Sequence, residues 1–443
     1  MSRYETLRAV TRLSTLLTLI VFAMILGFLY DSRVLIALFE ALVAVAGLSY
    51  LYVRLASSRL AASRTFAPRA YEDESVRVTL RLANRFGLPL FLVELRDWFP
   101  CDALPEKRIV AQRVPANGGV QVEYSGLCAH GRGRFEIGPL EVTVSDPLGL
   151  FRITTALPPV SELVVYPKTF PIRDLGLREL QWHAPLSLST DRIGHAATFF
   201  GTREYRQGDN IRRVHWPSTM RWGRMILKEF EQDTNLEVTC FLDLNRASLR
   251  GVGRGSNVEQ AVRIAASLAE HTTSRLCSFQ LIADPGSPLV LPARPGKQQL
   301  MAALDALARV RPSGRTPYLD LVSNAMRLVG EGSGIVLIFN TLDVDETAMF
   351  AVLAEVMRKR ARIVPVALDD ATFLPLETSG PRRSDSAARL DRLRAAMAGF
   401  GMEPVVIRAG DDLAEVFANP VVPASVGKPE LTLEEELKLV EAM

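Results

Sequence analysis

The stretch LEVTCFLDLNRAS, residues 236–248, decides the fold of the longer part of the chain. Its first seven residues contain a single charge, and the run ends at Asp243 in a polar loop. Similar apolar runs follow at residues 278–284, 334–340, 362–369 and 404–410. Amphipathic stretches such as 257–271 and 344–360 separate them. Strands that are apolar on both faces and alternate with helices indicate a parallel sheet covered on both sides. We therefore expect an α/β domain over residues 236–422.

The preceding part of the chain has a different pattern. VRVTLRLAN (76–84) and VQVEYSGL (120–127) alternate apolar and polar positions, and Gly and Pro residues separate such runs. This alternation is typical of half-buried antiparallel strands. It predicts a small all-β domain over residues 67–170, with a sandwich as the preferred architecture and a barrel as the alternative.

The N-terminal region, residues 1–66, contains two apolar segments at 13–30 and 34–53. Each is close to the ~20 residues that a helix needs to cross a bilayer. A signal peptide is the alternative for the first segment, but the second follows almost at once without a small-residue cleavage site. Arginines flank the outer ends of the pair, so both ends should face the cytoplasm. The sequence thus predicts a two-pass membrane anchor, with the soluble domains inside the cell.

Charge and cysteine content exclude several classes of protein. The 443 residues include 52 basic and 49 acidic side chains, so the net charge is only +3. No long basic run is present, which argues against a nucleic-acid-binding protein. The four cysteines are scattered, which argues against a zinc site or a disulfide framework. No phosphate-binding G-x-x-x-x-G-K-[ST] loop occurs, so ATP-driven work would need another protein.

Residues 171–235 connect the two predicted domains and include the Arg-rich stretch GTREYRQGDNIRRVHW (201–216). Asp209 and His215 are candidates for an acid–base pair, but no nucleophile motif such as G-x-S-x-G accompanies them. Its arginines could contact phosphates, yet acidic residues such as Glu204 and Asp209 alternate with them. A hydrolase is therefore the least favoured interpretation, and we expect a non-enzymatic protein without a cofactor.

The same stretch carries a family resemblance. It follows GRGRFEIGPLEVTVSDPLGLFR (131–152) and leads into LDLNRAS (242–248). This order resembles the bacterial and archaeal membrane proteins called domain of unknown function 58, over essentially the whole chain. The family pattern G-x-R-x-Y-x-x-G-D-x-x-R-x-x-x-W is matched by Gly201, Arg203, Tyr205, Gly208, Asp209, Arg212 and Trp216.

The resemblance implies a fold and a partner. It implies that the α/β domain is of the von Willebrand factor A-like (Rossmann-like) class. It also implies association with an AAA+ ATPase of the MoxR type, occurrence beside a transglutaminase-like membrane protein, and a role as an adaptor or scaffold in complex assembly or envelope maintenance.

Domains of the von Willebrand A class often hold a divalent cation above the sheet through D-x-S-x-S, a threonine and a later aspartate. The corresponding residues here are Asp243, Asn245, Thr316 and Asn340. Only one is a carboxylate, Ala247 replaces the last serine, and Arg246 adds a positive charge. Because Mg²⁺ prefers several oxygen ligands that include carboxylates, we favour a degenerate site without metal. The alternative is a metal-dependent ligand-binding protein. Other polar residues, Asp284 and Asp369, also fall near the ends of predicted strands, where ligands bind in open α/β sheets.

Two roles remain open for the family pattern. We favour a clasp between the two domains, formed by Arg203, Tyr205, Asp209, Arg212 and Trp216. Docking of a partner is the second role and does not exclude the first, since Arg, Tyr and Trp are common interface anchors. The last segment, 423–443, ends in LTLEEELKLVEAM, which predicts a short acidic amphipathic helix.

Overall fold

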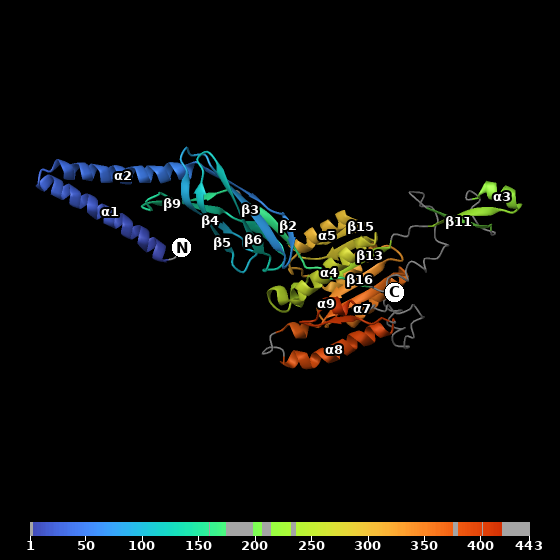
Figure 1. The fold of residues 1–443 in the computed structure, drawn as a ribbon. Helices are drawn as coiled ribbons and strands as arrows, with labels where there is room; N and C mark the ends of the chain where they lie inside the picture. Colours follow the sequence, from blue (N-terminus) through green and yellow to red (C-terminus); the bar gives the residue numbers. More distant parts are fainter. Residues whose placement is uncertain are drawn as a thin grey trace. The chain divides into compact units, whose positions relative to one another are not determined.

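The computed structural model describes residues 3–158, 160–173, 198–205, 214–231, 236–374, 380–400 and 402–418. The chain divides into two compact units. Unit 1 comprises Met1–Lys168 with Asp305–Arg309, and unit 2 comprises Thr169–Leu304 with Val310–Met443. The predicted tail helix at 423–443 lies outside the described residues. Figure 1 shows the elements of each unit.

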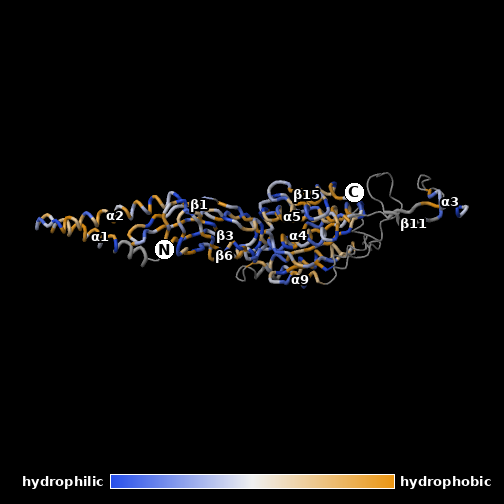
Figure 2. The backbone as a smooth tube through the Cα atoms, turned by 45° about the horizontal axis from the view of Figure 1, so that its top comes forward, coloured by the Kyte–Doolittle hydropathy of each residue, from blue (hydrophilic) through white to orange (hydrophobic). Residues whose placement is uncertain are grey.

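Unit 1 begins with a helical hairpin formed by α1 (Arg3–Leu29) and α2 (Arg33–Ser58). The turn between them is tight: the N–H of Ser32 donates to the carbonyl of Gly27, and a side chain at Gly27 would meet Ile36. Both helices are long and apolar enough to cross a membrane, and hydrophobic residues recur along both of them (Figure 2). The two predicted apolar segments are therefore confirmed as helices. However, α2 continues beyond the predicted end at residue 53, because its last turns pack on the strands that follow.

The rest of unit 1 consists of strands, and no helix occurs among its described residues between 60 and 158 or between 160 and 166. The strands are β1 (Leu60–Thr65), β2 (Arg69–Tyr71), β3 (Ser75–Asn84), β4 (Leu90–Trp98), β5 (Glu106–Val114), β6 (Gly119–Leu127), β7 (Gly133–Ile137), β8 (Leu140–Ser145), β9 (Arg152–Leu157) and β10 (Ser161–Tyr166). They form sheets with the orders β1-β3-β6, β2-β10-β7 and β5-β4-β8-β9. Alternate residues of β3 are buried, as its sequence pattern predicts.

One apolar core joins these sheets to the end of α2. Val78 and Leu80 of β3, Leu95 of β4 and Val142 of β8 belong to the same buried cluster as Val53 of α2. The helix that leaves the apolar hairpin is thus continuous with the core of the β-region. The first strand begins at residue 60, seven residues before the predicted start of the β-domain.

Unit 2 is built around a six-stranded sheet. Its strands are β13 (Glu237–Leu242), β14 (Ser278–Ala283), β15 (Leu289–Arg294), β16 (Gly334–Phe339), β17 (Arg362–Leu368) and β18 (Val405–Ile407). The order is β15-β14-β13-β16-β17-β18, with β15 antiparallel and the other strands parallel. The sheet is therefore mixed, whereas the sequence predicted a parallel one. Its parallel strands all lie within the predicted apolar runs.

Helices connect these strands. The connecting helices are α4 (Asn257–Ser274), α5 (Lys297–Arg309), α6 (Tyr318–Ala325), α7 (Glu346–Arg358) and α8 (Gly380–Ala398), and the short α9 (Leu413–Val416) follows the last strand. Their starts follow local chemistry: the Ser256 hydroxyl caps α4 by accepting from the N–H of Glu259, and the Asp345 carboxylate caps α7 by accepting from the N–H of Thr347. The apolar faces of α6, α7 and α8 share a core with β13, β16 and β17.

A separate antiparallel pair, β11 (Thr198–Glu204) and β12 (Ile226–Glu231), precedes this sheet in the chain. The short helix α3 (Trp216–Trp222) lies between the two strands in sequence. Neither strand belongs to the six-stranded sheet. We call β11, α3 and β12 the insert hairpin.

Candidate functional site

The strand order of unit 2 places one site above the sheet. The chain moves outward from β13 in one direction to β14 and in the other direction to β16. Ligands of open α/β sheets bind beyond the carboxyl ends of the strands at such a reversal. Asp243 directly follows β13, and Asn340 directly follows β16. The two residues therefore lie at the position where this kind of sheet forms a site.

Asp243 is almost fully buried, at 1% exposure. Its Oδ1 atom accepts a hydrogen bond of 2.9 Å from the N–H of Asn245, whereas its Oδ2 atom is buried and accepts no hydrogen bond of normal geometry from the described residues. Burial raises the pKa of this carboxyl group, and the N–H of Asn245, the side chain of Ser248 and the N–H of Asn340 only partly offset that effect. Asp243 is thus an incompletely compensated acid at the sheet edge.

Asn340 is bound to the same loop. Its Nδ2 atom donates to the backbone carbonyl of Asp243 at 2.6 Å, and its buried Oδ1 atom has no partner among the described residues. Two buried oxygens, one from a carboxylate and one from an amide, are therefore left here without a hydrogen bond of normal geometry from the described residues. Buried unpaired oxygens are rare in proteins and often mark a bound water or ion.

The other two predicted ligands are already engaged. Asn245 accepts from the N–H of Ala247 through Oδ1 and donates to the carbonyl of Thr316 through Nδ2. The Thr316 hydroxyl donates to Oδ2 of Asp284 at 2.6 Å. The structure thus brings Asp243, Asn245, Thr316 and Asn340 to one edge of the sheet. Of the four, only Asp243 and Asn340 have a buried oxygen without a hydrogen bond of normal geometry from the described residues, whereas the Thr316 oxygen, which donates its hydrogen to Asp284, keeps its lone pairs.

Two further residues complete this edge: Asp284, which the sequence already placed near the end of a strand, and Asn257, which it did not assign to the site. Asp284, after β14, holds Thr316 through the hydrogen bond above. Asn257 donates through Nδ2 to the carbonyls of Ser248 and Asn340, at 2.7 and 2.8 Å, and accepts from the N–H of Arg250. Its position at the start of a predicted helix gave no sign of these long-range bonds. Within the described ranges no group of three or more His, Cys, Asp or Glu side chains could hold a metal ion.

A second polar cluster lies after β17. Asp370 is buried and pairs with Arg250 at 3.6 Å and with Arg389 of α8 at 3.3 Å. Its neighbour Asp369 accepts a hydrogen bond of 2.6 Å from the Ser386 hydroxyl. These contacts hold the start of α8 against the loops above the sheet. Both acids are satisfied and therefore structural.

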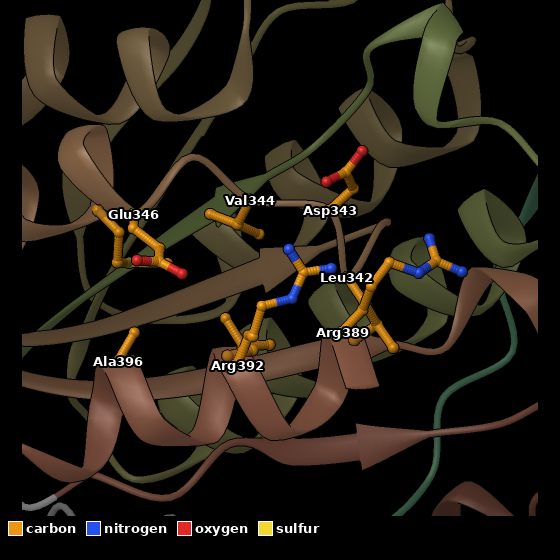
Figure 3. A pocket seen from close by; sticks show the side chains of 9 residues that line it. Leu342, Asp343, Val344, Glu346, Arg389, Arg392 and Ala396 are labelled. Atoms are coloured by element: carbon orange, nitrogen blue, oxygen red, sulfur yellow. The ribbon is translucent and has the colours of Figure 1, made fainter. Parts of the chain in front are cut away.

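A shallow pocket adjoins this cluster, between α8 and the loop that leads into α7. Figure 3 shows Arg389 and Arg392 rising from α8 toward the segment that carries Leu342 and Asp343. Glu346 adds a second acid to the lining. Acids and arginines are thus mixed in a half-open depression, which defines neither an anion site nor a cation site.

The Arg-rich family pattern falls on the insert hairpin and only part of it is described. Arg203 lies in β11, and the N–H of Tyr205 donates to the carbonyl of Met225 at 2.9 Å. Trp216 is the first residue of α3. Asp209 and Arg212 lie outside the described residues. The clasp between domains and the docking of a partner therefore both stay predictions.

His215, which the sequence offered as a base, has a structural role. The Nδ1 atom of its ring forms a hydrogen bond of 2.7 Å with the Ser218 hydroxyl, and its backbone N–H donates to the backbone carbonyl of Ile226. It thereby holds the start of α3 against β12.

The insert hairpin has a small core and an exposed apolar surface. Val214, Ile226 and Leu227 are buried. Large side chains on and beside α3 remain exposed: Trp216 at 60%, Met220 at 83%, Trp222 at 62% and Met225 at 38%. We call these four residues the α3 patch. Arg224 lies 6.0 Å from the Trp222 ring and forms an exposed ion pair with Glu204.

Comparison with known proteins gives one family match. The model of the family described as "Protein of unknown function DUF58" matches residues 201–386, which is less than half of the chain. The match begins at the insert hairpin and ends within α8. It supports the family resemblance for this region, but it is shorter than the whole-chain resemblance inferred from the sequence. No curated protein matches the chain by sequence.

Solved structures share only distant similarity with the chain. A PKD domain of a peptidase from a Thermoplasmatales archaeon is 11% identical, covering 22% of this chain and 94% of its own, with a TM-score of 0.14. A sporulation control protein from Bacillus subtilis is 10% identical, covering 33% and 58%, with a TM-score of 0.16. An exo β-N-acetylglucosaminidase from Vibrio harveyi is 10% identical, covering 87% and 97%, with a TM-score of 0.19. These scores are too low to relate any of the folds.

Proposed function

We propose that the protein is a membrane-anchored, non-enzymatic adaptor that works with an AAA+ ATPase of the MoxR type in complex assembly or envelope maintenance. In this proposal α1 and α2 form a two-pass anchor in the cytoplasmic membrane of a bacterium or archaeon. The β-region is a sandwich and unit 2 is a von Willebrand A-like domain, both on the cytoplasmic side. A transglutaminase-like membrane protein is a further candidate partner. The strand order of unit 2 and the two apolar helices support this architecture.

The α3 patch is the observation that carries the adaptor proposal. It places two tryptophans and two methionines on a surface where they are at least 38% exposed. Trp and Met are enriched in protein interfaces, and a few such anchors usually supply most of the binding free energy. The patch also lies inside the part of the chain that matches the family model.

Affinity purification of the full chain from native membranes tests the proposal. We expect the wild-type protein to retain an AAA+ ATPase in at least one nucleotide state. The double variant Trp216→Ala with Trp222→Ala should reduce that recovery about tenfold or more, because interface tryptophans often contribute 2 kcal/mol or more each. Trp98→Ala is a matched control, since Trp98 is 47% exposed but lies in unit 1.

The outcomes separate the two roles of α3. The wild-type chain retaining no ATPase in any nucleotide state would contradict the adaptor. Undiminished recovery of the ATPase by the double variant would show that the α3 patch is not the docking surface. A large loss of thermal stability in that variant would instead support the clasp, because removing exposed side chains otherwise changes stability little.

A metal-dependent ligand-binding protein is the second candidate, and the unpaired oxygens of Asp243 and Asn340 favour it. A cation above the sheet would neutralise the buried acid and take up both oxygens, with water completing its coordination. The fit is partial, because Asn245 is engaged and Thr316 is bound to Asp284. Titration calorimetry with Mg²⁺ and Mn²⁺ tests this function. Equal heats for the wild-type protein and Asp243→Ala would exclude it.

A further inference from the structure

The end of α2 is built into the β-region at the level where the helix would leave a bilayer. The helix from Val34 to Tyr52 is about 27 Å long at 1.5 Å per residue, close to the ~30 Å of a hydrocarbon core. Tyr50 and Tyr52 therefore fall where aromatic side chains gather at a membrane surface. Arg54 and Arg59 follow them and are exposed.

Two loops of the β-region contact α2 at these tyrosines. The Tyr52 hydroxyl donates to the carbonyl of Pro89 at 2.6 Å, and its ring packs edge-to-face on Phe86. The Tyr50 ring packs edge-to-face on Phe151, with ring centres 5.6 Å apart. We call residues 86–92 and 146–151 the juxtamembrane loops. Because they contact Tyr50 and Tyr52 directly, they lie at the same height along α2 as its predicted exit from the bilayer.

The first helix gives the same level independently. Arg12 is the first residue of the apolar window of α1. Its guanidinium group lies so close to Gly149 that a side chain added to this glycine would meet it. The second juxtamembrane loop thus lies beside the ends of both apolar helices that are remote from their connecting turn.

Both juxtamembrane loops expose large apolar side chains. Leu88 is 52% exposed, Phe91 40%, Leu92 64% and Leu148 54%. Leu92 has a positive φ of 53°, a strained conformation for leucine, and the pairing of β4 with β8 is irregular between Phe91 and Glu94. Such irregularities redirect side chains out of a strand. Arg85, also exposed, adds a positive charge beside these residues.

We propose that the juxtamembrane loops form a second membrane contact, in which Leu88, Phe91, Leu92 and Leu148 enter the interfacial layer of the bilayer beside α2. This inference rests on the membrane anchor in the proposed function. The lipid bilayer is the expected partner of these side chains, because their apolar surface adjoins the point where α2 leaves the lipid. The contact would limit tilting of the β-region relative to the bilayer, since it adds a second attachment beside the helices.

Depth-dependent quenching of a fluorescent label tests the proposal. The full chain, with Cys277→Ser to remove the one cysteine that is not buried, receives a single new cysteine for an environment-sensitive dye. It is reconstituted into phosphatidylcholine–phosphatidylglycerol vesicles that carry nitroxides near the headgroup end of the acyl chains. We expect labels at Leu92→Cys and Leu148→Cys to lose emission in these vesicles.

Two further positions serve as controls. Phe22→Cys, in α1 and 61% exposed in the structure, reports insertion of the anchor. Leu104→Cys is at a site that is 75% exposed and lies beyond the opposite end of β4. The strand itself is roughly 25 Å long at ~3.3 Å per residue. A label at Leu104→Cys should keep its emission.

Quenching at Phe22 without quenching at Leu92 and Leu148 would overturn the second contact and leave the anchor standing. Blue-shifted emission at Leu92 without lipid quenching would also overturn it, because a protein surface would then cover the loop. Loss of quenching at Phe22 as well would overturn the anchor, and the second contact with it.

Discussion

Asp243 carries the least compensated charge at the edge of the sheet in unit 2. Its carboxyl group is buried, one of its oxygens accepts no hydrogen bond of normal geometry from the described part of the chain, and burial raises its pKa. A raised pKa in the folded state stabilises the fold at low pH, where the group is protonated in both states. That contribution is lost as the pH rises through the folded-state pKa. The ionised acid therefore weakens the fold near neutral pH unless a cation neutralises it.

The variant Asp243→Asn should accordingly be more stable than the wild-type protein at neutral pH without divalent cations. The expected gain is about 1–3 kcal/mol, the typical cost of an unsatisfied buried polar group. The difference should disappear toward the ordinary aspartate pKa of about 4. Thermal unfolding of both proteins across this pH range measures the effect.

Asp284→Asn provides the matched control for this prediction. Both oxygens of Asp284 accept hydrogen bonds, from the N–H of Gly286 and from the Thr316 hydroxyl. Its neutralisation should therefore lower the unfolding midpoint or leave it unchanged. A variant Asp243→Asn that is less stable than the wild-type protein at neutral pH would contradict the prediction and show that the carboxylate is compensated.

The sequence predicts the residues of this site better than their contacts. Asp243 and Asn340 are recognisable because each follows an apolar run, and parallel strands end at one edge of a sheet. Asn245 has the spacing of a ligand and keeps a side-chain oxygen, yet that oxygen caps the turn that contains Ala247. The bond between Thr316 and Asp284 joins two loops separated by 32 residues. No local pattern records such a bond, because it depends on how the loops pack.

At the scale of elements, the local hydrophobic pattern was sufficient to predict the central strands of the unit 2 sheet from the sequence, but it did not reveal the edge strand β15. The central strands β13, β14, β16 and β17 are buried on both faces, so their sequences are almost wholly apolar. The antiparallel edge strand β15 alternates between half-buried and exposed residues and contains Pro292. Proline is tolerated at a sheet edge but weakens the strand signal in the sequence. The sequence analysis therefore did not find β15, and without this antiparallel strand it predicted a purely parallel sheet.

Unit 1 contains a contact between strands that the sequence also did not reveal. Arg64 of β1 and Asp97 of β4 form an ion pair whose side chains are at most 1% exposed. The Tyr124 hydroxyl of β6 donates to the same carboxylate at 2.7 Å. The pair connects two of the sheets that share the core of this unit. In the sequence Arg64 counts as one of the basic residues after the second apolar segment, because neither its burial nor its partner is visible there.

At the scale of the molecule, the hairpin determines which parts of the chain share a compartment. Helices α1 and α2 are separated by Tyr30, Asp31 and Ser32, so a chain that crosses the membrane twice returns at once. Arginines lie before α1's apolar window and after α2's exit, and basic residues favour the cytoplasmic side. In the proposed orientation we therefore expect Asp31 to face the exterior and the soluble parts of both units to face the cytoplasm.

Cysteine labelling in intact cells tests this orientation. In a Cys277→Ser background, Asp31→Cys should react with a membrane-impermeant maleimide in intact cells, because Asp31 is exposed at the hairpin turn. Val252→Cys, at a site 91% exposed in unit 2, should react only after the membrane is permeabilised. The opposite pattern would place unit 2 outside the cell, where a cytoplasmic ATPase could not reach the α3 patch. Labelling of both positions in intact cells would contradict a two-pass anchor, because two crossings keep the turn and unit 2 on opposite sides.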